Sequence, residues 1–235
     1  MTYQVFPEKI PGFIMKLLQV FPLTLSIMLA SLGLALAVGV LVAVAQLSGN
    51  RVANAAARCW VSLMRGIPSL VMIFLLYFGL PQVIKAATGI DLSSASKMTF
   101  VVAALSLIAS ANIGEAMRSS YLAVPRDQTE AALACGMTPR QAALRITIPQ
   151  AVAVAVPLFG NIVVSLFKET SLGFSIGVID LMGRANVIAA ANYGAYRLEL
   201  YVAVAVIYWV FCVVLMIVFA GLESVTTRGR RSARA

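Results

Sequence analysis

The sequence contains no histidine, the side chain most often used as a general base or metal ligand near neutral pH. Its three cysteines, Cys59, Cys135 and Cys212, lie far apart and form no Cys-x-x-Cys pair. This pattern indicates neither a disulfide framework nor a zinc site. The phosphate-binding pattern Gly-x-x-x-x-Gly-Lys-Ser/Thr does not occur either. We therefore predict no catalytic site, no metal site and no ATPase site in this chain.

Charged residues are also scarce, at 11% of the 235 residues, whereas a soluble domain has about 25%. Hydrophobic residues make up 61% of the chain, and the mean hydropathy is +0.93. This composition is typical of an integral membrane protein. The net charge of +9 is better explained by basic loops that remain in the cytoplasm than by nucleic-acid binding, because no soluble domain is left to bind a nucleic acid.

Stretches without charged residues predict five transmembrane helices in a single all-α membrane domain over residues 1–235. Each stretch is close to the ~20 residues that cross ~30 Å of hydrocarbon. The predicted spans are residues 22–47, 67–84, 97–121, 148–167 and 200–222. A short amphipathic segment over residues 1–21 precedes them, and a basic tail over residues 223–235 follows them.

The distribution of Lys and Arg predicts how the spans are oriented. Eleven of the 18 basic residues fall in one set of connecting segments and in the tail, and seven fall on the other side. Cytoplasmic segments carry the excess of Lys and Arg. We therefore expect the N-terminus outside the cell, and the C-terminus and residues 126–147 in the cytoplasm.

Small residues and prolines predict local features of the first two spans. In lipid, a stripe of small side chains lets another helix approach closely, although alanine is common in all these spans. The stripe of the first span consists of Ser31, Ala35, Gly39 and Ala43. In the second span, Pro68 suits the first helical turn, and Gly79 and Pro81 are predicted to end the helix. A turn is expected at Thr88–Gly89.

Residues 126–147 are too polar to cross a bilayer. Asp127 and Glu130 are spaced like an N-cap and its third-position acid, and Gly136 is placed to end that helix in the left-handed conformation. A second helix is then predicted to begin with a cap, a proline and a capping-box partner, at Thr138, Pro139 and Gln141. Such a pair of helices outside the lipid either contacts a partner protein or is only a structural loop.

The third span carries Asn112, Glu115 and Ser119 on one helical face. A carboxylate at a membrane boundary is costly unless it is paired or faces water. Either Glu115 forms a local ion pair with Arg118 that closes the span at the cytoplasmic surface, or Glu115 lines a transport pathway.

One face of the fourth span carries polar side chains at Asn161, Ser165, Lys168 and, one residue further, Glu169. Amides, hydroxyls and both charge signs suit a zwitterionic amino acid, whose carboxylate needs donors and whose ammonium needs a carboxylate. Alternatively, the charged pair reaches the outer interface and the two uncharged residues bind a neighbouring helix. The candidate pathway residues are Glu115, Asn161, Ser165, Lys168, Glu169, Thr170 and Ser171.

The stretch between the third and fourth spans resembles the EAA loop of ATP-binding-cassette importer permeases. That motif has E-A-A, three residues, G, nine residues, and I-x-L-P. Here it is present as Glu130-Ala131-Ala132, Gly136 and Ile146-Thr147-Ile148-Pro149, with Ile148 in place of leucine. The triplet alone is common in helices, but the glycine, isoleucine and proline are all in register with it.

Two further segments resemble the polar amino-acid permeases of the histidine, glutamine, glutamate and arginine type. The segment RGIPSLVMIFLLYFGLP is similar to their second span, and GNIVVSLFKETSLGFSIGVIDLM is similar to their fourth span and its continuation. The resemblance covers residues 20–222. Cys135 replaces the usual leucine, and ANIGE replaces a more aromatic sequence before the third-span acid.

This resemblance implies a type I importer permease in a bacterial cytoplasmic (inner) membrane. Two such permeases, of the same or homologous chains, pair around a pathway, and an extracytoplasmic binding protein delivers a polar amino acid. Separate ATPase subunits bind ATP and Mg, and each accepts one EAA loop in a groove. The residues implied to couple to the ATPase are Glu130, Ala131, Ala132, Gly136, Thr138, Pro139, Arg140, Ile146 and Pro149. Alternatives are an importer of opines or cystine, and an ATP-independent channel or secondary transporter.

Overall fold

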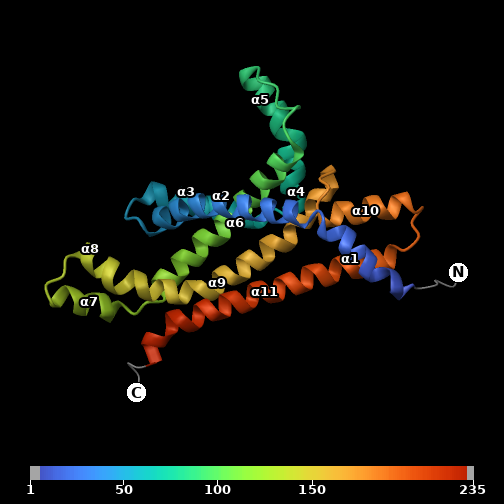
Figure 1. Cartoon of the computed structure of the whole chain (residues 1–235). Helices are drawn as coiled ribbons and strands as arrows, with labels where there is room; N and C mark the ends of the chain where they lie inside the picture. The colour runs from blue at the N-terminus through green and yellow to red at the C-terminus, as the bar shows by residue number, and fades with distance from the viewer. Residues whose placement is uncertain (1–5, 232–235) are drawn as a thin grey trace.

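The computed structural model describes residues 6–231, which are helical throughout apart from short connections (Figure 1). Five helices in this part of the chain are long and apolar enough to cross a membrane, which confirms the number of predicted spans. These candidate spans are Phe21–Leu47, Ser69–Thr88, Lys97–Leu122, Pro139–Ile176 and Arg197–Thr226.

The α-helices are α1 (Ile10–Leu18), α2 (Phe21–Leu47), α3 (Arg51–Gly66), α4 (Ser69–Phe74), α5 (Leu80–Thr88), α6 (Lys97–Leu122), α7 (Arg126–Ala134), α8 (Pro139–Ala142), α9 (Ile148–Glu169), α10 (Leu181–Ala191) and α11 (Arg197–Arg231). The shorter elements are the 3₁₀-helical η1 (Pro7–Lys9) and η4 (Thr170–Ile176), and the π-helical η2 (Leu75–Gly79) and η3 (Ala143–Thr147).

Helices α2 and α6 form the centre of the bundle, and small residues set how closely they approach. The predicted stripe of α2 is buried against the rest of the bundle. A Cβ atom added to Gly39 would lie 2.6 Å from Cγ2 of Ile113 on α6, and one added to Gly114 would lie 2.7 Å from Cγ1 of Val42. Such distances are too short for carbon atoms, so each helix needs a glycine at the crossing. The predicted packing face is confirmed.

Helix α3 occupies a segment that we interpreted from the sequence only as a basic loop. Asn50 caps it, because its Oδ1 accepts hydrogen bonds from the backbone N–H groups of Val52 at 2.9 Å and Ala53 at 3.3 Å. The apolar side of α3 packs against α2 and α6. This side consists of the buried residues Ala57, Val61 and Met64.

The second span is longer than predicted, because the helix continues past Gly79 and Pro81. Pro81 has no N–H to donate to the Tyr77 carbonyl, and its ring would clash with that carbonyl in a regular α-helix. The chain widens to a π turn instead, in which the Leu80 N–H bonds to the Leu75 carbonyl. The helix ends where a turn was predicted, at Gly89, whose φ is 76°. Pro68 precedes α4 and is not within its first turn.

A second apolar cluster joins α1, α10 and α11. Phe13 and Leu17 of α1 are buried in it, so the apolar side of the predicted amphipathic segment packs against protein. The Phe6 N–H donates to Oε1 of Glu199 at 2.8 Å, which ties the segment to α11. Residues 1–5 of the predicted segment, and residues 232–235 of the predicted basic tail, lie outside the described residues.

Candidate functional site

Helices α7 and α8 form a hairpin at one end of the bundle (Figure 1). Gly136 has a φ of 84°, and the N–H groups of Gly136 and Met137 bond to the carbonyls of Leu133 at 2.9 Å and Ala132 at 3.1 Å. This pattern is a Schellman motif, which satisfies the last carbonyls of α7. The predicted glycine turn is therefore confirmed.

The two helix starts differ in how well they were predicted. Thr138 and Gln141 form the predicted capping box, with N–H to side-chain distances of 3.3 and 2.9 Å. The predicted cap at Asp127 is wrong, because α7 begins at Arg126 and Asp127 lies within its first turn. Pro125 precedes α7 and makes no side-chain cap.

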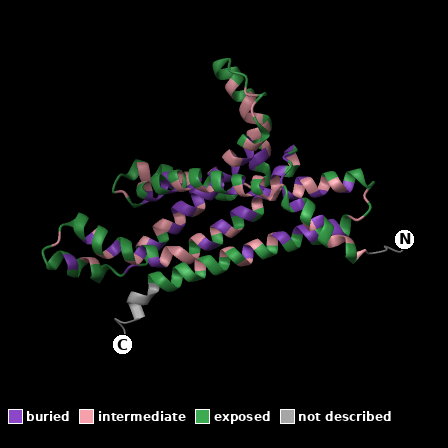
Figure 2. Ribbon diagram, in the orientation of Figure 1, coloured by how far each residue is buried: buried purple, intermediate pink, exposed green. Residues whose placement is uncertain are grey.

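The hairpin is held by small contacts and leaves most of its surface open (Figure 2). Ala132 of α7 and Ala142 of α8 are buried, and the hydroxyls of Thr129 and Thr147 share a hydrogen bond of 3.0 Å. Ile146 is half-buried. The other EAA-loop residues named above are exposed, namely Glu130, Ala131, Gly136, Thr138, Pro139, Arg140 and Pro149.

Helix α8 runs through η3 directly into α9. The junction has a π turn in which the Ile148 N–H bonds to the Ala143 carbonyl. Pro149 follows this turn, as Pro81 follows η2, so the same device accommodates a proline in both long helices. The hairpin is therefore connected to the fourth span without a flexible loop.

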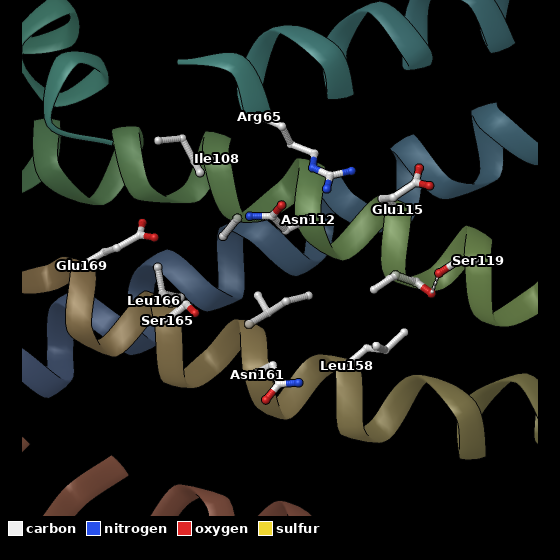
Figure 3. A pocket seen from close by; sticks show the side chains of 13 residues that line it. Arg65, Ile108, Asn112, Glu115, Ser119, Leu158, Asn161, Ser165, Leu166 and Glu169 are labelled. Atoms are coloured by element: carbon white, nitrogen blue, oxygen red, sulfur yellow. Dashed lines mark hydrogen bonds between the residues drawn. The ribbon is translucent and has the colours of Figure 1, made fainter. Parts of the chain in front are cut away.

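A polar cavity of about 370 Å³ lies between α6 and α9 and extends to the end of α3 (Figure 3). Four of the candidate pathway residues line it, namely Glu115, Asn161, Ser165 and Glu169. The other lining residues are Arg65, Ile108, Ala109, Asn112, Ala116, Ser119, Leu158, Ile162 and Leu166. The cavity thus joins polar residues of two spans that the sequence analysis treated separately.

Glu115 forms the predicted local ion pair and also lines the cavity. Its carboxylate accepts hydrogen bonds from Nε and a terminal nitrogen of Arg118, which is the predicted local ion pair. Nε2 of Gln46 on α2 also donates to it, at 3.3 Å. The same carboxylate lines the cavity. Its charge is therefore balanced by a neighbour on its own helix.

Glu169 lies at the other end of the cavity and has a different environment. Its Oε2 accepts a hydrogen bond of 3.1 Å from the Ser69 hydroxyl at the start of α4. Among the residues whose side chains the structure describes, no cation lies within 4.0 Å of this half-buried carboxylate. Glu169 thus forms no ion pair in the described residues, and the adjacent Lys168 acts on its carboxylate only at longer range.

Three candidate pathway residues do not line this cavity. Lys168 and Ser171 are on the wall of a neighbouring shallow hollow, which they share with Ser165 and Glu169. Thr170 is fully buried, and its hydroxyl donates to the Phe167 carbonyl at 2.7 Å. Thr170 is at the end of α9, where the helix tightens into η4, so its hydroxyl completes a helix end and does not reach the cavity.

Arg65 lines the cavity and Ser69 contacts Glu169, and neither position was predicted from the sequence. From the sequence, Arg65 was considered only as one of the basic residues of a connecting segment. The cap at Asn50 and the helical spacing of the apolar residues Ala57, Val61 and Met64 could have indicated that this segment is a helix. The contact of Ser69 with Glu169 joins positions 100 residues apart, and no local pattern signals it. In the described part of the chain, no three His, Cys, Asp or Glu side chains come together as a metal site.

A family model described as "Binding-protein-dependent transport system inner membrane component" matches residues 35–227. The probable amino-acid permease protein YxeN of Bacillus subtilis is 35% identical over 198 residues, which cover 84% of this chain and 85% of YxeN. The L-cystine transport system permease protein TcyL of Bacillus subtilis is 34% identical, over 87% of this chain and 84% of TcyL. The histidine/lysine/arginine/ornithine permease protein HisQ of Salmonella typhimurium is 32% identical, over 86% and 90%.

Solved structures show the same fold. A crystal structure of an amino acid ABC transporter with histidines has a TM-score of 0.83 and 27% identity, over 94% of this chain and 98% of that chain. An inward-facing structure of the MetNI methionine ABC transporter has a TM-score of 0.65 and 21% identity, over 90% and 94%, and supports the fold alone. The EAA-loop geometry, the five spans and the matched family model all agree. This chain therefore belongs to the family of binding-protein-dependent transport system inner membrane components.

Proposed function

We propose that this chain is the membrane-spanning permease subunit of an ATP-driven, binding-protein-dependent importer of polar amino acids. The observation that carries the proposal is the capped α7–α8 hairpin, which is exposed at one end of the bundle and runs directly into α9. A transmitting element needs an exposed contact surface and a stiff connection to the span that it moves. Relatives named as amino-acid permeases support the same function.

The partners follow from this role. The exposed hairpin surface docks on a separate cytoplasmic ATPase, which binds ATP and Mg. A second permease, of the same or a homologous chain, completes the pathway in a bacterial inner membrane, and a binding protein delivers substrate from outside. The excess of basic residues on the hairpin side supports an outside N-terminus and a cytoplasmic hairpin and C-terminus.

Transport then proceeds by domain-scale alternating access. ATP binding draws the two ATPases together and pushes on α7 and α8. Because α8 and α9 are continuous, the push changes how α9 faces α6 and opens the pathway outward. Hydrolysis returns it to the inward-open state. The permease itself makes and breaks no covalent bond.

The cavity between α6 and α9 is the proposed substrate pathway. Asn161 and Ser165 offer uncharged donors and acceptors, and Glu169 offers a carboxylate that forms no ion pair in the described residues. A carboxylate in such a setting attracts the ammonium group of an amino acid. Lys168 and Ser171 lie beside this path, in the neighbouring hollow.

The test is purification of the tagged chain with its ATPase, followed by reconstitution with the binding protein. We expect ATP-dependent uptake of radiolabelled L-histidine, L-arginine, L-glutamine or L-glutamate into proteoliposomes. Glu169→Gln should reduce uptake of the transported amino acid. Uptake that proceeds without ATP would instead indicate a channel or secondary transporter and would contradict the proposal.

A further inference from the structure

Among the described residues, Arg65 is the only cationic side chain that lines the cavity, and it forms no ion pair. It lies at the last turn of α3, and in Figure 3 its guanidinium points toward Asn112 and Glu115 of α6. Within residues 6–231, no carboxylate oxygen lies within 4.0 Å of its nitrogens. A charge held beside membrane-spanning helices is costly unless it is paired or faces water, so this exposed arginine is suited to bind a mobile anion.

The resident carboxylates do not fill this role. Glu115 is already bound by Arg118 and Gln46, and the charge of Arg65 reaches it only at longer range. Glu169 is held by the neutral Ser69 hydroxyl. The cavity wall therefore has one cation, Arg65 of α3, and one carboxylate, Glu169 of α9, that form no ion pair among the described residues.

We propose that Arg65 binds the α-carboxylate of the transported amino acid as it passes the end of the cavity opposite Glu169. This inference rests on the proposed function, because it requires an amino acid to pass through this cavity. The planar guanidinium matches a carboxylate with two parallel hydrogen bonds, and Asn112 lies beside it on the cavity wall. Lys168, the cation suggested by the sequence, lies outside the cavity.

Ser69 has a positioning role at the other pole. It follows Arg65 by four residues, across the short connection between α3 and α4. Its hydroxyl donates to Oε2 of Glu169 at 3.1 Å and leaves Oε1 without a hydrogen-bond partner among the described residues. Arg65, which binds the carboxylate, and Ser69, which orients the carboxylate of Glu169, therefore lie on either side of one short connection.

The test measures binding to the purified permease–ATPase complex in lipid nanodiscs, without binding protein. The probes are L-histidine, L-arginine and L-glutamine, each compared with its α-carboxamide, which lacks the carboxylate charge. The wild type should prefer the acid by about ten- to hundredfold, the range for hydrogen bonds to charged groups. Arg65→Gln should bring that ratio close to one, and Arg65→Lys should give an intermediate ratio because it keeps the charge but loses the fork.

Arg58→Gln is the matched control, because Arg58 lies two turns earlier on the same helix and lines a separate surface hollow. It should keep the wild-type ratio. Ser69→Ala should instead lower the preference for the amino acid over its des-amino analogue, by about two- to tenfold. A wild-type ratio in Arg65→Gln, or an equal loss in Arg58→Gln, would overturn the role of Arg65. If the wild type neither binds nor transports any amino acid, the proposed function itself fails.

Discussion

Replacing Gly136 by valine tests whether the α7–α8 hairpin transmits force. The φ of Gly136 is 84°, and a Cβ atom there would meet no atom within 4 Å. The substitution therefore acts through backbone strain alone. A non-glycine residue held in a sparsely populated conformation costs roughly 1–3 kcal/mol, and a β-branched residue tolerates positive φ badly.

This cost is large for so small a unit. Helix α7 has 9 residues and α8 has 4, whereas isolated helices below about 12–15 residues are marginal in water. A change of 1–2 kcal/mol shifts a two-state ratio by a factor of roughly 5–30. We therefore expect Gly136→Val to open the turn in a large fraction of molecules while the membrane bundle stays folded.

The assay is ATP hydrolysis by the reconstituted complex, stimulated by substrate-loaded binding protein, together with retention of the ATPase during purification. Gly136→Val should lose stimulation or lose the ATPase. Gly136→Asn should keep most of both, because asparagine enters the left-handed region readily. Gly33→Val is the control for a new side chain in an open position, since nothing lies within 4 Å of Gly33. Normal coupling in Gly136→Val would refute the role of the hairpin.

Two further variants test the packing and the electrostatics of the fold. Gly39→Ala should lower the apparent Tm of the purified protein, because the new Cβ would lie 2.6 Å from Cγ2 of Ile113. Overpacking of this kind costs about 1–3 kcal/mol, and each kcal/mol lowers the Tm by about 2–4 °C. Gly33→Ala, on the same helix, should not, and equal Tm values would contradict the close α2–α6 crossing. Burial raises the pKa of Asp180, which caps α10, from its ordinary 3.8 to about 6. The protonated carboxyl therefore contributes stability at low pH, and this contribution is lost as the pH rises from 3.8 to about 6. Asp180→Asn should keep the cap and raise the Tm at pH 8 more than at pH 5, and an equal effect at both pH values would contradict this reasoning.

The sequence predicts the spans well because their main cause is local. A membrane helix needs an uninterrupted apolar stretch, and such stretches can be counted along the chain. The hairpin turn was predictable for a similar reason, since Gly136, Thr138 and Gln141 act on backbone groups within a few residues. Proline was misleading at Pro81, because a π turn lets the helix continue where a regular α-helix would stop.

The cavity was less predictable, because it depends on which helices cross. The polar faces of the third and fourth spans were visible in the sequence, but their common cavity requires α6 and α9 to pack side by side. The choice between Lys168 and Arg65 as the cavity cation depends on the rotation of α9 and the end point of α3. Neither quantity follows from residue spacing within one segment.

The arrangement of α9 connects the two halves of the proposed mechanism. Its first residues continue from the hairpin through η3, and its last residue is Glu169. Pro157 interrupts the hydrogen bonds between these ends, and at Gly160 a Cβ atom would lie 2.9 Å from the Phe219 ring of α11. The close contact with α11 holds the middle of α9, while the missing hydrogen bond lets it bend there. A displacement at α7 and α8 can therefore change the distance between Glu169 and Arg65, which belongs to a different helix, without unfolding either one.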